Sequence, residues 1–327
     1  MRLETERLLL RPWQESDAED LYRYASDPKV GPIAGWPVHT SVENSREIIR
    51  DVLSEQETYA VVLKSEGHAV GSVGLMIGSA SNLALPDTEA EIGYWIGVPF
   101  WGQGLIPEAV REITRYAFEE LHMEKLWCGY YDGNIKSKRA QEKCGFLYHH
   151  TNQDVPCQLM GDIRTEHVSC LPKERWMIRR TEVYDILPDC ARNIRHTVFV
   201  EEQGFQEEFD TIDQTAAHIV MFGKEETPIA TCRVFWDASK ESYILGRLAV
   251  VKEYRGKNIG SLMIQEAERY VQSVGGESLA LHAQFRAADF YRKSGFEAYG
   301  DIEDEQGCPH IWMKKYVGNN THTEEMN

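Results

Sequence analysis

The feature that most constrains this fold is an internal repeat of two short glycine-bearing segments. In the first half, Trp101-Gly102-Gln103-Gly104-Leu105-Ile106 opens a helical pattern, and Lys143-Cys144-Gly145-Phe146 follows it. In the second half, Arg255-Gly256-Lys257-Asn258-Ile259-Gly260 and Lys293-Ser294-Gly295-Phe296 recur in the same order. Such self-similarity indicates two copies of one folding unit. The 327 residues suffice for two domains, each of about 150 residues.

The pattern of apolar residues supports an α/β (α+β) class, with a mixed sheet flanked by helices in each half. In the first half we expect strands at 8–10, 59–63, 70–77, 90–96 and 125–131, and helices at 18–25, 42–53, 106–117 and 137–143. In the second half we expect strands at 180–186, 218–222, 229–235, 243–250 and 278–283, and helices at 189–200, 259–270 and 287–294. The predicted domains are 1–176 and 177–317, with turn residues Leu171–Trp176 at the boundary. The polar, aperiodic segment 318–327 is predicted to be disordered.

The two glycine turns are candidate sites for a pyrophosphate. A turn that opens a helix presents unpaired backbone N–H groups at the positive end of the helix dipole. Glycine lets an anion approach the backbone closely, because no Cβ intervenes. Arg255 and Lys257 add positive charge in the second half, whereas the first half offers Gln103 and backbone amides.

Charge and cysteine usage exclude several classes of protein. The formal net charge is −17, with an acid excess in both halves, which argues against a nucleic-acid partner. An acidic surface is also able to attract cationic amines. The seven cysteines are scattered and never spaced as Cys-x-x-Cys. We therefore expect no metal site and a cytoplasmic location. We expect no membrane segment either.

The first half resembles the ribosomal-protein-alanine N-acetyltransferase (Rim-type) branch of the GNAT superfamily. The resemblance rests on the following stretches: Leu3–Trp13, Glu91–Ile96, Trp101–Ala109, and Asn134–Ser137 leading to Gly145-Phe146. The second half resembles the ElaA-like GNAT group. The matching stretches are Val198–Gly204, Arg247–Val250, Arg255–Gly260, Leu281–Gln284 and Phe290–Phe296. Asn258 departs from the family pattern, which usually has glycine there, but asparagine tolerates left-handed backbone angles.

The resemblance implies two tandem GNAT (acyl-CoA N-acyltransferase) domains, each with a splayed sheet that holds acetyl-CoA as co-substrate. Main chain at the end of one parting strand would pair with the pantetheine amides, and the glycine turns would hold the pyrophosphate. The implied cofactor-binding residues of the first half are Ile96, Val98, Gly102, Gln103, Gly104, Leu105, Ile106, Asn134 and Ser137. Those of the second half are Leu248, Val250, Arg255, Gly256, Lys257, Asn258, Ile259, Gly260 and Tyr291.

Acetyl transfer to an amine requires a base for the ammonium proton and an acid near the departing sulfur. The resemblance implies that Tyr291 is the acid of the second half, the alternative being a core residue at the start of a helix. Ser137 is the analogous donor in the first half, or it caps a helix together with Asn134. Glu91 is the candidate base, or a solvated strand residue.

The base of the second half is less defined by the sequence. Glu208, Asp210, Asp213 and His218 cluster after the first helix of that half. The acidic residues either recognise a cationic amine or form a solvated loop, and His218 is either a base or a structural hydrogen bonder.

The sequence thus predicts an acetyl-CoA-dependent N-acetyltransferase that acts on a primary amine, either a protein N-terminus or a small amine. One alternative is that one or both domains bind acyl-CoA as a sensor or scaffold without catalysis. A tRNA-dependent aminoacyl transferase is a further alternative, but it would need a degraded cofactor loop and a basic groove. The sequence leaves the oligomeric state and the acyl-chain preference open.

Overall fold

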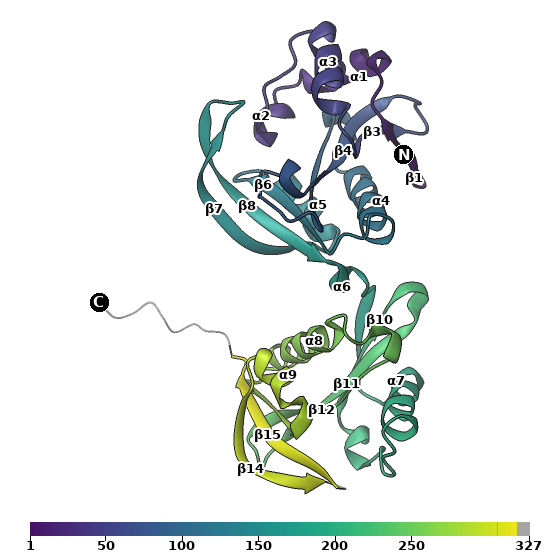
Figure 1. The fold of residues 1–327 in the computed structure, drawn as a ribbon, viewed down its shortest axis with the longest axis vertical. Helices are drawn as coiled ribbons and strands as arrows, with labels where there is room; N and C mark the ends of the chain where they lie inside the picture. Colours follow the sequence, from purple (N-terminus) through teal and green to yellow (C-terminus); the bar gives the residue numbers. More distant parts are fainter. Residues whose placement is uncertain (306, 319–327) are drawn as a thin grey trace, which may run out of the picture. The chain divides into compact units, whose positions relative to one another are not determined.

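Two units, Met1–Lys173 and Glu174–Asn327, make up the chain in the computed structural model (Figure 1). The structure describes residues 1–305 and 307–318. The predicted disordered segment 318–327 lies outside these residues, apart from Gly318. Pro172 ends a strand, and the short helix α6 (Lys173–Trp176) occupies most of the predicted boundary segment. None of the described helices is long and apolar enough to cross a membrane.

The first domain contains an eight-stranded mixed sheet in the order β1-β2-β3-β4-β5-β6-β8-β7. The strands are β1 (Leu3–Glu4), β2 (Leu8–Pro12), β3 (Thr58–Leu63), β4 (Ala69–Ile77), β5 (Glu89–Ile96), β6 (Lys125–Tyr131), β7 (Leu147–Cys157) and β8 (Asp162–Pro172). The helices are α1 (Ala18–Ala25), α2 (Gly31–Ala34), α3 (Val42–Ile48), α4 (Leu105–Glu119) and α5 (Ile135–Lys143). Helix α3 continues as a π-helical turn, Ile49–Leu53.

Helices cover both faces of the centre of this sheet. Strand β4 contacts α1 and also α4. Val70 and Val73 are fully buried in β4, and β3 is buried from Tyr59 to Leu63. Continuous apolar runs of this kind are expected where a strand is covered on both sides. Side chains alternate along β5 as along any strand. Ile92, Tyr94 and Ile96 point to one face, and Glu91, Gly93 and Trp95 point to the other.

The second domain contains a seven-stranded mixed sheet in the order β14-β15-β13-β12-β11-β10-β9. The strands are β9 (Arg180–Tyr184), β10 (Ala217–Phe222), β11 (Pro228–Asp237), β12 (Ser242–Val250), β13 (Ser278–Gln284), β14 (Glu297–Glu305) and β15 (Cys308–Tyr316). The helices are α7 (Asp189–Arg195), α8 (Ile259–Ser273) and α9 (Ala288–Lys293). A π-helical segment, His196–Glu201, extends α7.

Strand β10 shows how two helices divide the faces of this sheet. Val220 and Phe222 pack in a cluster with Leu187 and Ala191, at the start of α7. Ile219 and Met221 belong instead to the main core, which includes residues of α8. Side chains of a strand point alternately to opposite faces, so every residue of β10 is buried.

The structure confirms every helix and strand predicted from the apolar pattern, with shifts of a few residues at their ends. The sequence did not predict the two hairpins that complete the sheets, β7–β8 and β14–β15. Their strands lack the expected alternation: β7 is exposed or half-buried along all its length except Cys157. Both hairpins are held by backbone pairing with a central strand, which sequence pattern alone does not report.

The repeated Gly-Phe dipeptides end equivalent helices in the two domains. Phe146 N donates to Gln141 O at 3.1 Å, and Phe296 N donates to Tyr291 O at 3.1 Å. Gly145 and Gly295 have φ angles of 86° and 87°. Both helices thus end in a Schellman motif, in which a left-handed glycine allows the next amide to cap the helix. The following phenylalanine is buried in each case, which explains why the dipeptide repeats.

Candidate functional site

In each domain one pair of parallel strands separates after a few residues. Strands β5 and β6 are paired from Glu89 to Glu91 only. Strands β12 and β13 are paired at Tyr243 and Ile244 only. Beyond these points the N–H and C=O groups on the inner edges of the strands face an opening. The structure thus confirms the splayed mixed sheet that the sequence predicted.

In the first domain the parting strand leads into the predicted glycine turn. Gly102 and Gly104 have φ angles of 77° and 76°, and Gly104 is the N-cap of α4. The first hydrogen bond of the helix is donated by Glu108 N to Gly104 O. The N–H groups of Leu105 and Ile106 precede this bond and have no acceptor within the helix. Both side chains are buried, so only main chain is available to a ligand here.

Two cations adjoin this turn, contrary to the expectation that the first half offers only Gln103 and backbone amides. Arg7, beside β2, donates from Nη1 to Gln103 O at 3.0 Å and forms an ion pair with Glu108 at 2.6 Å. The Nζ atom of Lys136, on α5, lies 3.6 Å from the ring centroid of Trp101. The amide of the Gln103 side chain donates to Pro99 O. The sequence did not reveal Arg7 because about a hundred residues separate it from the turn that tertiary structure brings to it.

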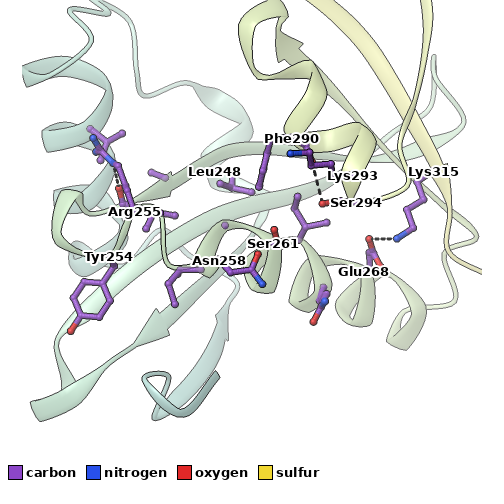
Figure 2. A pocket seen from close by; sticks show the side chains of 18 of the residues that line it. Leu248, Tyr254, Arg255, Asn258, Ser261, Glu268, Phe290, Lys293, Ser294 and Lys315 are labelled. Carbon is purple, nitrogen blue, oxygen red and sulfur yellow. Dashed lines mark hydrogen bonds and ion pairs between the residues drawn. The ribbon is translucent and has the colours of Figure 1, made fainter. Parts of the chain in front are cut away.

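The second domain has an open pocket of about 1010 Å³ at the equivalent place (Figure 2). The pocket lies along β12, the turn before α8, α8 itself and the end of α9. Among the predicted cofactor-binding residues, those that line it are Leu248, Val250, Arg255, Gly256, Asn258, Ile259 and Gly260. Asn258 is the N-cap of α8 with a φ angle of 56°, so it does adopt the left-handed conformation. Lys257 does not line the pocket, and its Nζ lies 5.4 Å from the ring of Tyr254.

The end of the parting strand is anchored in the same way in both domains. Trp101 Nε1 donates to Ile96 O at 2.9 Å. Arg255 Nε donates to Val250 O at 2.8 Å. Each donor stands five positions after its acceptor, immediately before a glycine turn. Arg255 also forms an ion pair with Glu202 at 2.6 Å. The side chain before the turn therefore fixes the turn to the strand, a role that the sequence did not suggest.

A bulge in β12 sets the course of its last residues. Thr231 pairs with Ala249 and Arg233 pairs with Gly246, so that Arg247 and Leu248 together lie opposite a single residue of β11. Arg247 has a φ angle of 53°, and its guanidinium lies 3.0 Å from the Glu208 carboxylate. Bulges of this kind bend a strand and re-aim its side chains.

The acidic cluster after the first helix of this domain is part of a buried ion-pair network. Arg195, with a side chain 1% exposed, pairs with Glu208 and Asp213 at 2.6 Å each. Arg233 pairs with Asp210 and Asp213 at 2.6 and 2.9 Å. Burial raises the pKa of Asp213, but hydrogen bonds from Arg195 and Arg233 outweigh burial and hold its pKa well below its usual range.

These contacts decide between the interpretations of the cluster. Glu208 and Asp213 are buried, so they neither form a solvated loop nor reach an amine, whereas Asp210 is exposed and pairs with Arg233. His218 is fully buried, and its Nε2 lies 3.0 Å from Asp213 O. Burial lowers the pKa of His218. His218 is therefore a structural hydrogen bonder, and the network supports the β12 bulge.

In the first domain, Glu91 lies at the last paired position before β5 and β6 separate. Its carboxylate accepts a hydrogen bond from Ser81 Oγ at 2.7 Å. Burial raises the pKa of Glu91, the Ser81 hydrogen bond partly opposes the shift, and the charge of Glu166 on β8 adds to it. A Cβ at Gly129 would lie 2.7 Å from the Glu166 carboxylate. A glycine inside β6 was the available signal that another group approaches this strand.

Ser137 belongs to a pair of hydroxyl groups on the opposite face. Asn134 is the N-cap of α5 and accepts from Ser137 N at 3.2 Å, so Asn134 caps the helix and Ser137 does not. Ser137 Oγ lies 3.0 Å from Tyr94 Oη. Burial raises the pKa of Tyr94 well above its usual range. Tyr94 was missed, although a tyrosine in a buried strand needs a hydrogen-bond partner.

Tyr291 of the second domain lies within the short helix α9 and not at its start. Its ring contacts Phe290 and Phe296 at centroid distances of 5.0 and 6.1 Å. Burial raises its pKa to about 12. The pocket is lined by Phe290, the residue before it, and not by Tyr291 itself. Within residues 1–305 and 307–318 no group of three or more His, Cys, Asp or Glu side chains is placed to hold a metal ion.

Comparison with known proteins identifies the family of both domains. Residues 7–147 match the model of an acetyltransferase (GNAT) domain, and residues 187–317 match a second model with the same description. The chain belongs to the GNAT acetyltransferase family. Its two GNAT domains follow one another in sequence, and each contains one of the glycine turns described above.

Individual relatives cover parts of the chain. The protein YyaT of Bacillus subtilis is 33% identical over 137 residues, which are 40% of this chain and 89% of that protein. YdaF of the same organism, provisionally named a ribosomal N-acetyltransferase, is 44% identical over 77 residues, which are 24% of this chain and 42% of that protein. A GNAT-family acetyltransferase from Bacillus anthracis is 22% identical, with a TM-score of 0.48, over 53% of this chain and 99% of that structure.

The buried network of the second GNAT domain leads to a prediction about stability. Asp213→Asn removes one negative charge that faces two buried guanidinium groups. We expect the free energy of unfolding of this domain to fall by about 3 kcal/mol, because an uncompensated buried charge is costly. Urea unfolding followed by tryptophan fluorescence measures the change. Asp289→Asn, which breaks an exposed ion pair with Arg292, is the control, with an expected loss below about 0.5 kcal/mol.

The same network predicts a dependence on pH. The folded-state pKa of Asp213 is depressed. Its stabilising contribution is therefore complete above the unfolded pKa of about 3.9 and decreases as the pH falls below it. The difference between wild type and Asp213→Asn should shrink in acid. Equal effects of the two substitutions, or no change with pH, would contradict this role.

Proposed function

We propose that this GNAT protein transfers an acetyl group from acetyl-CoA to a primary amine by direct attack within a ternary complex. One observation carries the proposal. In both domains a strand parts from its parallel neighbour and leads directly into a turn that opens the N-terminus of a 15-residue helix. This arrangement suits a ligand with amide groups at one end and a pyrophosphate at the other.

The pocket of the second domain is the proposed cofactor site there. Main chain at Leu248–Val250 would pair with the pantetheine amides, because this segment lines the pocket beyond the paired part of β12. The turn from Gly256 to Gly260 would hold the pyrophosphate with the first N–H groups of α8. Arg255 would contribute charge once its contact with Glu202 is exchanged for phosphate, and Lys257 stands next to it.

The first domain would bind the cofactor with the equivalent main chain. Ile96 ends the parting strand, Val98 begins the short 3-10 turn that follows it, and Gly102–Ile106 form the glycine turn. Gly97 N donates to Val70 O on β4, so alternation points the N–H of Ile96 toward the opening, on the side where its C=O accepts from Trp101 Nε1. Arg7 and Lys136 would supply positive charge at the turn. Asn134 caps α5 and Ser137 lies in its first turn, and residues of this helix contact α4.

Glu91 is the proposed base of the first domain. It lies on the face of β5 opposite the turn-bearing helix, which allows an amine to reach the opening from the side away from the cofactor. A carboxylate with a raised pKa accepts a proton more readily than an ordinary glutamate. Glu91 would take one proton from the ammonium group, and the nitrogen would then attack the thioester carbonyl.

Ser137 is the proposed acid of the first domain. As the C–N bond forms and the C–S bond breaks, the departing thiolate would receive a proton from Ser137, whose oxygen is hydrogen-bonded to Tyr94. The second proton of the attacking nitrogen restores the hydroxyl pair, so the products are the amide and CoA thiol. Tyr291 is the proposed acid of the second domain, because it follows Phe290, which lines the pocket, and because a phenol with an ordinary pKa of about 10 is protonated at neutral pH.

The surroundings of Glu91 favour a cationic acceptor. Glu166 adds a second negative charge near Glu91. The ring of Trp95, on the same face of β5, lies 5.8 Å from that of Trp36. Arg164 Nη1 donates to Pro32 O at 2.7 Å, which ties the segment before Trp36 to β8. A protein N-terminus or a small amine fits these features, and the name of the relative YdaF favours the former. We propose a cytoplasmic location, with which the free thiols of the cysteines agree.

Cofactor binding tests the first part of the proposal. Gly104→Glu and Gly256→Glu each place a carboxylate where the pyrophosphate would lie, at residues with φ angles of 76° and 72°. Calorimetry of the wild-type chain should give two equivalents of acetyl-CoA, and each variant should lose one. Gly67→Glu and Gly275→Glu are matched controls, since both glycines have positive φ and free space but lie away from the turns. The controls should keep both equivalents; a wild-type chain that binds none would refute the proposal.

The role of Glu91 predicts a pH profile. With Gly256→Glu to isolate the first domain, the acetylation rate should fall as the pH drops through the raised pKa of Glu91, above its ordinary value of 4.5. Glu91→Gln should reduce kcat by about 10²- to 10⁴-fold and remove this dependence. Glu89→Gln, two residues earlier on the same face, should have little effect. Full activity of Glu91→Gln would exclude Glu91 as the base, and intact binding without any transfer would favour the sensor alternative.

A further inference from the structure

One face of the second domain carries histidine, acidic and aromatic side chains that the proposed mechanism does not use. Backbone pairing aligns them in two rows across β13, β15 and β14. The first row contains His282, Trp312 and Tyr299, and the second contains Gln284, His310 and Glu303. Leu281 and Ala283, which alternate with these residues on β13, belong to the core that includes α8. The two rows therefore lie on the face of the sheet opposite α8.

The side chains of these rows contact one another around His282. The imidazole of His282 stacks on Trp312, with ring centroids 4.7 Å apart and an interplanar angle of 16°. The ring centroid of His310 lies 5.0 Å from that of His282. The Nε2 atom of His282 lies 3.6 Å from a carboxylate oxygen of Glu303. A protonated imidazole at this place would therefore face the Glu303 carboxylate as an ion pair.

The cluster stands at the opening between the parted strands. Pairing of β12 with β13 ends at Ala280, two residues before His282. The cofactor pocket lies on the other face, because residues of α8 and α9 line it. Gln284 Nε2 donates to Gln203 Oε1 at 3.3 Å, and Gln203 lines that pocket. A ligand that extends through the opening from the pocket would thus emerge beside His282 and Gln284.

The aromatic surface formed by Trp312 and Tyr299 already contacts an ammonium group. The Nζ atom of Lys240, from the β11–β12 connection, lies 4.2 Å from the ring centroid of Trp312. Tyr299 packs 6.4 Å from the same ring. An acceptor ammonium could take the place of Lys240 over Trp312, since ring faces attract cations of this kind. The chemistry of the surface therefore suits a primary alkylammonium group.

We propose that His282, paired with Glu303, is the general base of the second domain, and that this domain acetylates a primary alkylamine of its own. This inference rests on the proposed acetyl-CoA-dependent function. The imidazole of His282, whose Nε2 is enclosed and faces Glu303, takes one proton from the ammonium group at its other ring nitrogen, and the freed nitrogen attacks the thioester carbonyl. The C–N bond forms, the C–S bond breaks, and Tyr291 gives a proton to the thiolate. The second nitrogen proton restores Tyr291, which leaves the amide, CoA thiol and a protonated His282 beside Glu303.

The test uses the full chain with Gly104→Glu, which leaves the second domain as the site of transfer. The acceptors are butylamine, 1,5-diaminopentane and a lysine-containing peptide, and release of CoA thiol measures the rate. We expect transfer to occur, with a rate that falls in acid as a histidine becomes protonated; this fall is the acid limb of the pH profile. His282→Gln should lower the rate at neutral pH by about 10²- to 10⁴-fold, abolish the limb and leave acetyl-CoA binding unchanged. His196→Gln, an exposed histidine of the same domain, is the matched control and should retain activity.

Glu303→Gln separates a chemical role from a structural one. Removing this charge should move the acid limb to lower pH, because the carboxylate stabilises the protonated imidazole. His310 and Lys240, which lie near His282 and Trp312, and Asp237, whose charge acts on Tyr299, remain in this variant. An unmoved limb, or an unchanged rate in His282→Gln, would overturn the assignment. Absence of transfer by a Gly104→Glu chain that still binds one equivalent of acetyl-CoA would also overturn it.

The experiments distinguish a failure of this inference from a failure of the proposed acetyl-CoA-dependent function. If the Gly104→Glu chain binds no acetyl-CoA, the second cofactor site itself is wrong. If that chain binds the cofactor but does not use the amines, while the Gly256→Glu chain acetylates an amine, only the second acceptor site fails. His282→Gln should abolish the acid limb of the rate in the Gly104→Glu chain and leave the rate of the Gly256→Glu chain unchanged. That pair of results would place the base in the second domain.

Discussion

The separation of one parallel strand pair in each domain is the constraint on which the rest of both sites depends. A paired strand has no free edge, so its N–H and C=O groups are unavailable to a ligand. Strands β5 and β12 lose their parallel neighbours partway along and therefore expose main chain inside an otherwise covered sheet. The opposite edges stay bonded to β4 and β11, which keeps the exposed groups in fixed positions.

The two domains stabilise this opening by different means. In the second domain a bulge in β12 and the buried network of Arg195, Asp213 and Arg233 support the strand from one side. In the first domain, Tyr94 reaches from β5 to Ser137 on α5. The hydroxyl pair has no charge to desolvate, whereas the network must keep every ion paired. The same backbone arrangement therefore places different chemistry around the two openings.

Much of the fold follows from local sequence features. The turn residues Gly104 and Asn258 adopt the left-handed conformation that opens each long helix. Apolar residues at helical spacing place α4 and α8, and continuous apolar runs place the central strands. The hairpins β7–β8 and β14–β15 could not be predicted in this way. Their residues satisfy backbone hydrogen bonds with β6 and β13, and that pairing has no signature in β-strands with half-exposed side chains.

The sequence by itself determined the family, the doubling of the domain and the position of both glycine turns, because these depend on residues that are neighbours in the chain. It also singled out Glu91 and Ser137. Only the tertiary structure decided that Asp213 and His218 are buried, that Arg7 adjoins the first turn, and that Glu303 lies beside His282. The last two are contacts between segments distant in sequence, and the first is a burial that packing produces. All three depend on burial and distance, which folding alone establishes.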